Sequence, residues 1–278
     1  MGTLALKILI AFALAFFICP IHVLAENYIQ YFDHGKIDWS NRIIEAMGNG
    51  EPPADSINPA QARAMAKRKA VINARQNLYG LIKGLRVDSK NTIKDILSRA
   101  DMIASEMQGL LGNSQVVDIS YLSDGTVKAI AAVKLTDPFI DLILPRTIRD
   151  INPVQQPQIP KHSKDENFTG LILDCRGFKV NPAIVPRIID ENGAEIYGSA
   201  SVSREHVIRR GMAGYARDFK AAQANGRVAN KPLIVKGIRT GNQGLSDIVI
   251  SNADAAKIKG TASNLSFLQK CRVIMVLD

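Results

Sequence analysis

The sequence predicts a mixed α+β and α/β protein with two domains, each a small sheet covered by helices, joined by a proline-rich linker. At 278 residues the chain is longer than a single hydrophobic core usually organises. Alternating β-branched runs are interspersed with helical patterns in both halves of the chain. Residues 150–167 hold three prolines among Gln, Lys, His and Asp, a composition typical of an extended linker.

Residues 1–25 contain the three parts of a secretory signal peptide in the right order. Lys7 and the amino terminus supply positive charge, an apolar run follows over residues 8–19, and Pro20 ends it. Small residues then precede Glu26, so we expect cleavage after Ala25 and a location in the periplasm or at the outer membrane.

An uncleaved anchor over residues 4–25 is the alternative, but twelve apolar residues fall short of the ~20 that span a bilayer. Cleavage therefore leaves no expected transmembrane span. The exported chain keeps 34 basic and 26 acidic residues, a net charge of +8. Bulky Phe16, Phe17 and Ile18 precede Cys19, so we expect no lipid on that cysteine.

The first domain is predicted over residues 26–149 and contains two strand regions. A strand or hairpin is expected over residues 26–53, closed by the turn residues Gly48-Asn49-Gly50. Asp124-Gly125 is the strongest short hairpin signal that a sequence offers. It separates two β-rich runs, residues 116–121 and 126–135.

Two helices are predicted between these strand regions, and a short one over 138–144 after them. The first begins with Asn58 as N-cap and Pro59 at the first helical position, and runs to about Lys83. The second is expected over residues 92–111. The first helix carries two apolar stripes, so we expect it to contact both a sheet and another helix. The stripes are Ala64, Val71, Leu78 and Leu85 with Ile82, and Met65, Ile72 and Tyr79.

Residues 168–278 predict a mixed-sheet α/β domain. The last strand is wholly apolar and is therefore expected at the centre of the sheet. The predicted strands are 171–175, 184–190, 195–197, 233–238, 247–250 and 273–277. The predicted helices are 203–210, 215–224 and 253–265, with Ser203 and Asn252 as caps and Pro186 marking an edge strand.

Three stretches of the first domain carry a resemblance: Ala64–Ala70 with Ala74–Leu78, Ile82–Asp88, and Tyr121–Val127 (YLSDGTV). They resemble the lipoprotein-20 family of bacterial envelope proteins and are similar to the amino-terminal domain of the flagellar ring assembly protein T. The resemblance covers roughly residues 37–135. It implies export to the periplasm or outer membrane and a structural or assembly role without a cofactor. Lipidated family members carry a lipobox cysteine, from which this chain departs.

Residues able to do chemistry are scattered along the exported chain. His34, His162 and His206 lie in three different segments, and the G-x-S-x-G, H-E-x-x-H and C-x-x-C patterns are absent. We therefore expect no catalytic, cofactor-binding or metal site and hypothesise a non-catalytic protein. One alternative is an exported hydrolase with a site around Asp174, His206 and Asp247. Another is a small-ligand module with a concave pocket between domains hinged at the linker.

Cys175 and Cys271 each lie in or beside a predicted strand of the second domain. An exported chain meets an oxidising environment, so a disulfide between them is one possibility. Two buried thiols acting as small apolar side chains are the other. Spacing in the sequence does not decide between them.

The basic residues of the first predicted helix form no single stripe, because successive residues are turned by about 100°. They are Arg63, Lys67, Arg68, Lys69 and Arg75. A nucleic-acid interface needs a continuous basic face, so we expect no nucleic-acid partner. Instead the leading hypothesis is a structural, assembly or interaction protein that contacts envelope proteins or an anionic envelope surface.

Overall fold

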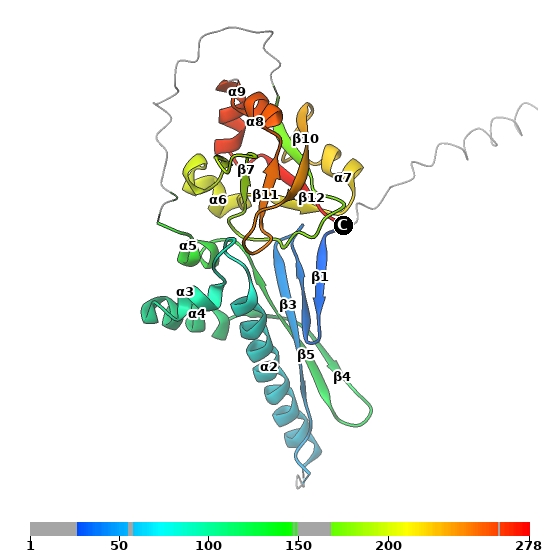
Figure 1. Ribbon diagram of the computed structural model, residues 1–278. Coiled ribbons are helices and arrows are strands. Elements are labelled where there is room, and N and C mark those ends of the chain that lie inside the picture. The colour runs from blue at the N-terminus through cyan, green and yellow to red at the C-terminus, as the bar shows by residue number, and fades with distance from the viewer. Residues whose placement is uncertain (1–26, 55–57, 147, 149–167, 261) are drawn as a thin grey trace, which may run out of the picture.

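The computed structural model contains two sheets with helices packed on them, which confirms the predicted mixed two-domain architecture (Figure 1). The structure describes residues 27–54, 58–146, 148, 168–260 and 262–278. The expected leader over residues 1–25 and the expected linker over residues 150–167 lie outside the described residues.

The first domain is a five-stranded antiparallel sheet in the order β1-β2-β3-β5-β4, with one long helix along one face (Figure 1). The hairpin around Asp124-Gly125 is confirmed, and Gly125 has the positive φ, +84°, that glycine adopts at little cost. The strands are β1 (Ile29–Phe32), β2 (Gly35–Asp38), β3 (Ile43–Gly50), β4 (Gln115–Tyr121) and β5 (Val127–Lys134).

Gly48 and Gly50 do not form the expected turn, because they are the end of strand β3 itself. Both are buried under the long helix α2 (Pro59–Gly84). A β-carbon at Gly48 would lie 2.1 Å from the backbone nitrogen of Ala74, and one at Gly50 would lie 2.0 Å from the carbonyl oxygen of Ala66. Glycine therefore lets the helix backbone rest directly on the strand.

Helix α2 begins where predicted, since the Asn58 side chain accepts a hydrogen bond of 2.9 Å from the backbone nitrogen of Ala60. Its buried face agrees with the first predicted stripe at Leu78 and Ile82 and differs from the prediction elsewhere. Met65 and Ile72, from the second predicted stripe, are 50% and 47% exposed. The buried residues instead recur every four positions: Ala66, Ala70, Ala74, Leu78 and Ile82. Small alanines become core here because glycines lie opposite them.

The second helix predicted in this domain is two helices, α3 (Ile93–Leu97) and α4 (Asp101–Gly112). The Ser98 hydroxyl donates 3.0 Å to the carbonyl oxygen of Asp95, an acceptor that a continuing helix would use for its own backbone. The short helix predicted after the sheet is confirmed as α5 (Phe139–Ile143).

The second domain is a seven-stranded mixed sheet in the order β8-β7-β11-β10-β6-β12-β9. Strand β12 lies between two parallel neighbours, as its apolar sequence predicted. The strands are β6 (Gly170–Asp174), β7 (Arg187–Ile189), β8 (Glu195–Tyr197), β9 (Gly214–Ala216), β10 (Pro232–Thr240), β11 (Asp247–Ile250) and β12 (Val273–Val276). The helices are α6 (Arg204–Arg210), α7 (Phe219–Ala224), α8 (Asn252–Lys259) and α9 (Ala262–Gln269). None of the helices in the described ranges is both long and apolar enough to cross a membrane.

Four predictions for this domain are wrong in detail. The single helix predicted over residues 253–265 is two helices, α8 and α9. Tyr215 lies in strand β9 and not in a helix, because its ring packs inside the core. Ser251, one residue before the predicted cap, accepts the capping hydrogen bond of α8 from Asp254. Strand β7 is internal and not an edge, because Pro186 precedes the strand and leaves its hydrogen bonds free to pair.

The close contact between α2 and β3 leads to a stability prediction. Gly48→Val places a side chain where backbone atoms of Ala74 and Ala70 already lie, so the helix must move. We expect the free energy of unfolding, measured by urea titration and circular dichroism, to fall by about 3 kcal/mol. Gly80→Ala is the control on the same helix, where a β-carbon meets nothing within 4 Å, and should stabilise by about 1 kcal/mol. Equal stability of Gly48→Val and the parent protein would contradict this packing.

Candidate binding cleft between the two domains

The two domains meet at Tyr215 of strand β9. Its buried hydroxyl donates 2.8 Å to the carbonyl oxygen of Ala183 and accepts 3.0 Å from the Ala183 nitrogen. From the first domain, the Ser40 hydroxyl donates 2.7 Å to the carbonyl oxygen of Tyr215. The Trp39 ring packs edge-on against the Tyr215 ring with 5.4 Å between centroids. One continuous hydrophobic cluster therefore includes residues of both domains.

A second set of backbone contacts joins the domains beyond this ring cluster. The nitrogens of Ile184 and Val185 donate to the carbonyl oxygens of Arg86 and Val87, at 3.0 Å and 2.7 Å. These two bonds tie the segment before β7 to the segment that follows helix α2. The junction is a packed and hydrogen-bonded interface, unlike the hinge considered from the sequence.

A tight loop between β2 and β3 presents the first domain's side of a cleft. The Asp38 carboxylate accepts hydrogen bonds from the backbone and side-chain nitrogens of Asn41, at 2.9 Å and 2.8 Å, which closes the loop. Arg42 follows with a φ of +58°, a left-handed conformation that is uncommon for a residue with a side chain. The turn thereby directs Arg42 toward the second domain.

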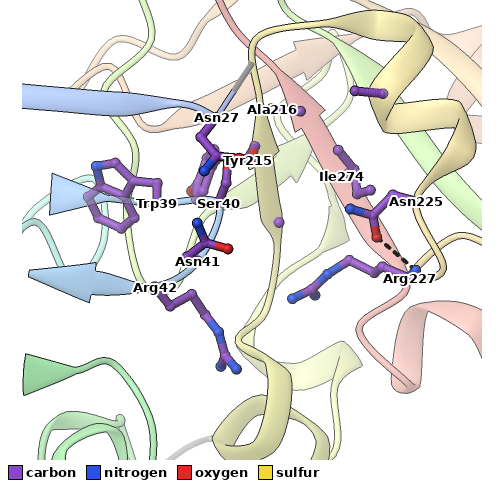
Figure 2. A pocket seen from close by; sticks show the side chains of 12 residues that line it. Asn27, Trp39, Ser40, Asn41, Arg42, Tyr215, Ala216, Asn225, Arg227 and Ile274 are labelled. Carbon is purple, nitrogen blue, oxygen red and sulfur yellow. Dashed lines mark hydrogen bonds between the residues drawn. The ribbon is translucent and has the colours of Figure 1, made fainter. Parts of the chain in front are cut away.

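The segment after helix α7 presents the opposite side. Asp218 caps α7 by accepting 2.8 Å from the nitrogen of Ala221, and Asn225 accepts 2.9 Å from the nitrogen of Arg227. These local turns place Asn225 and Arg227 beside strands β9 and β12. Figure 2 shows Arg42 and Arg227 reaching into one cleft from these two sides.

The cleft has a volume of about 330 Å³ and is more polar than apolar. Ser40, Asn41 and Asn225 contribute polar groups, and Ala216 and Ile274 contribute apolar ones (Figure 2). Its volume lies at the small end of the range for ligand pockets. It lies between the domains, as the small-ligand alternative predicted, although its walls are mainly polar.

Both arginines hold backbone carbonyl groups at the end of helix α6. Arg227 Nη1 donates to the carbonyl oxygens of Gly211 and Cys271, at 3.1 Å and 2.8 Å, and its Nη2 donates to that of Arg210. Arg42 Nη2 donates 2.9 Å to the carbonyl oxygen of Arg209. Cations are favourable at a helix carboxyl terminus, so these contacts stabilise α6 and hold it to the first domain.

The charge of this arginine pair is not neutralised by an acid. Within the described ranges, no Asp or Glu forms an ion pair with Arg42 or Arg227. Burial, with smaller contributions from the nearby cations Arg42 and Arg210, lowers the pKa of Arg227 to about 10. Burial likewise lowers the pKa of Arg42. Both shifts report guanidinium groups with reduced hydration and like-charged neighbours.

The residues considered for a hydrolase do not come together. Asp174 ends strand β6 and pairs with Arg176 at 2.8 Å, whereas Asp247 on β11 pairs with Arg187. His206 is on α6, where burial lowers its pKa and Lys270 is among the nearby cations. Lys270 precedes the start of β12, whereas Asp174 lies at the end of the parallel strand β6, so His206 lies toward the opposite end of these strands from Asp174.

Cys175 and Cys271 are free and buried in the structure. They lie at opposite ends of the parallel pair β6 and β12, since Cys175 follows Asp174 and Cys271 precedes Val273. Val273 pairs with Leu171, so the cysteines are at least four residues apart along the strands, roughly 13 Å. A disulfide requires Cα atoms about 4.4–6.8 Å apart. The bridge considered from the sequence is therefore not made, and the two-thiol alternative describes the structure.

The arginine pair was missed by sequence reasoning. The basic residues that the sequence drew attention to lie on α2 and serve local contacts: Arg63 stacks on Tyr121 at 4.8 Å, and Arg75 donates 3.1 Å to the carbonyl oxygen of Ser114. The only local signal for Arg42 is the Asp38-to-Asn41 turn before it. Nothing in the sequence pairs Arg42 with Arg227, because the two are far apart along the chain.

The free thiols lead to a chemical prediction. Burial raises the pKa of Cys271 to about 11 and raises that of Cys175 still further, so neither forms the reactive thiolate at neutral pH. We expect the exported chain to show two reactive thiols when unfolded without reductant, and negligible reaction when native, in a thiol-titration assay. Absence of both thiols from the unfolded, unreduced protein would reveal a bridge and contradict the structure.

The ion pair of Asp174 leads to a pH prediction. The hydrogen bonds from Arg176 lower the pKa of this carboxyl group in the folded state. Its stabilisation is therefore fully present above the unfolded value of about 3.9 and is lost as the pH falls through the folded value. Asp174→Asn should lower the free energy of unfolding by about 1 kcal/mol at pH 7 and by less near pH 3. Asp33→Asn, in the exposed β1–β2 turn, is the control; an unchanged loss for Asp174→Asn at both pH values would refute the assignment.

Comparison with known proteins adds one finding. Residues 170–278 match the family defined by the second domain of Treponema pallidum Tp0624. None of the curated proteins matches the chain. The matched residues begin with strand β6 and include the whole seven-stranded sheet. The second domain is thus similar to a second domain found in a bacterial family.

Proposed function

We propose that this chain is an exported, non-catalytic protein of the bacterial cell envelope with a structural, assembly or interaction role. It acts in the periplasm or at the outer membrane after cleavage behind Ala25. The signal-peptide pattern supports export. The resemblance of residues 37–135 to envelope and flagellar-ring proteins supports the structural or assembly role. The similarity of residues 170–278 to a domain of a bacterial protein supports a bacterial origin.

The proposal rests on the packed junction between the domains and on an arm, made of helix α2 and the β4–β5 hairpin, that projects from it. Helix α2 has 26 residues, a length of about 39 Å, and with the β4–β5 hairpin it extends away from the second domain (Figure 1). Both domains contribute to one hydrophobic cluster, so the arm and the second sheet are fixed to each other. Such a shape suits a protein that holds partners in a defined arrangement.

The outer face of the arm carries groups suited to a contact. Met65 and Ile72 are about half exposed on α2, two turns apart and outside its buried face. Exposed Arg68 and Lys69 lie between them along the helix. An exposed surface that combines apolar side chains with cations is suited to binding a partner protein or an anionic envelope polymer.

Capture from the envelope tests this proposal. Crosslinking in intact cells, followed by purification of this protein, should recover envelope components repeatedly. Replacing both Met65 and Ile72 by Glu should reduce that recovery about tenfold, because it removes the apolar contact and adds repulsion toward anionic surfaces. Met102→Glu is the control, a 74% exposed methionine on α4 outside the arm.

The location is tested in the same cells. The purified protein should have an intact mass that begins at Glu26 and should fractionate with the envelope. Repeated recovery of no envelope component, or an intact amino terminus on cytosolic material, would count decisively against the role.

A further inference from the structure

We propose that the cleft between the two domains is a binding site for a small oxyanion, a carboxylate or a phosphate group. Arg42 from the first domain and Arg227 from the second both line it (Figure 2). Neither arginine has an acidic partner in the described part of the chain. This inference goes beyond the envelope role and does not depend on it.

The hydrogen bonds of the two arginines leave donors for a ligand. Each guanidinium carries five N–H donors in a planar fork. The bonds to backbone carbonyl groups use only Nη1 and Nη2 of Arg42 and Arg227. Among the described residues, no other hydrogen bond uses the Nε donors or the remaining Nη hydrogens, so these donors can serve a carboxylate or phosphate.

Small residues make room for Arg227 in the second domain's wall of the cleft. A β-carbon at Gly214 would lie 3.0 Å from Nε of Arg227, so glycine lets the guanidinium lie this close to strand β9. Ala216 and Ala221 line the neighbouring wall with single methyl groups. Larger side chains at these positions would fill the space in front of the guanidinium.

Asp38, the acidic residue of the β2–β3 loop, does not neutralise the two arginines. The Asp38 carboxylate accepts hydrogen bonds from the side chains of Asn27 and Asn41 and from the backbone of Asn41. Its lone pairs are directed to the loop that it shapes, and the arginines form no ion pair with it. A bound anion would supply the negative charge that the protein leaves out.

The size of the cleft limits the ligand to a small molecule. About 330 Å³ accommodates an acidic group with a short body, not a polymer chain. Asn41, Asn225 and Ser40 offer polar contacts to the body, and Ile274 offers an apolar one. Inorganic phosphate and a small carboxylate both present negatively charged oxygen atoms to the guanidinium groups, and separate titrations distinguish between them.

The same arginines also cap helix α6, so a test must separate binding from stability. Trp39 is the only tryptophan of the chain and lines the cleft, which makes its fluorescence a local reporter. The purified protein is titrated with sodium phosphate, sodium acetate and sodium chloride at constant ionic strength. We expect saturable change with phosphate, acetate or both, and none with chloride.

Two variants and one control locate the site. Arg42→Gln removes one guanidinium and should weaken the binding of the oxyanion about tenfold or more. Ala221→Leu keeps every charge and fills the cleft, so it should abolish the saturable change while thermal unfolding stays near the parent value. Arg209→Gln, whose exposed side chain pairs with Glu205, keeps the carbonyl that Arg42 holds and should bind as the parent does.

Two results would overturn the proposed anion site. Absence of saturable change with both phosphate and acetate would overturn the proposal. A saturable change that persists unaltered in Ala221→Leu would place the anion elsewhere and would also overturn it. Because neither readout uses the envelope, this failure is distinct from failure to recover an envelope partner.

Discussion

The contact between the β2–β3 loop and Tyr215 is the constraint on which the rest of the molecule depends. The loop brings Trp39 against the Tyr215 ring and Ser40 onto the Tyr215 backbone, while the Tyr215 hydroxyl is held by Ala183. Through these bonds one tyrosine connects a loop of the first domain, strand β9 and the segment before β7. The backbone bonds of Ile184 and Val185 to the carbonyl oxygens of Arg86 and Val87 add to this contact in fixing the two sheets relative to each other.

Stiffness in the first domain has a different origin. Helix α2 approaches β3 closely because glycines on the strand face alanines on the helix. Backbone in contact with backbone leaves little room for the helix to tilt or slide. The arm can therefore project from the junction as a rigid element, which is the property that a scaffold or assembly protein needs.

The junction also concentrates positive charge that forms no ion pair with an acid among the described residues. Local turns position Arg42 and Arg227, and both donate hydrogen bonds to carbonyl oxygens at the carboxyl terminus of α6. The dipoles of these carbonyl groups stabilise part of the positive charge. Both guanidinium-bearing residues line a small polar cleft. One arrangement thus both joins the domains and prepares an anion site, and the two roles respond to different substitutions.

Local chemistry determined much of the architecture from the sequence by itself. Asn58 and Pro59 begin the long helix, Asp124-Gly125 turns the hairpin, and the apolar run at 273–276 becomes an internal strand, because each depends on neighbouring residues only. The mixed two-domain class followed from the same signals. Only the tertiary structure decided which face of α2 is buried, that Tyr215 belongs to a strand, and that Cys175 and Cys271 lie too far apart to bridge. The meeting of Arg42 with Arg227 was decided in the same way, because these outcomes depend on contacts between distant segments, and spacing along the chain carries no information about them.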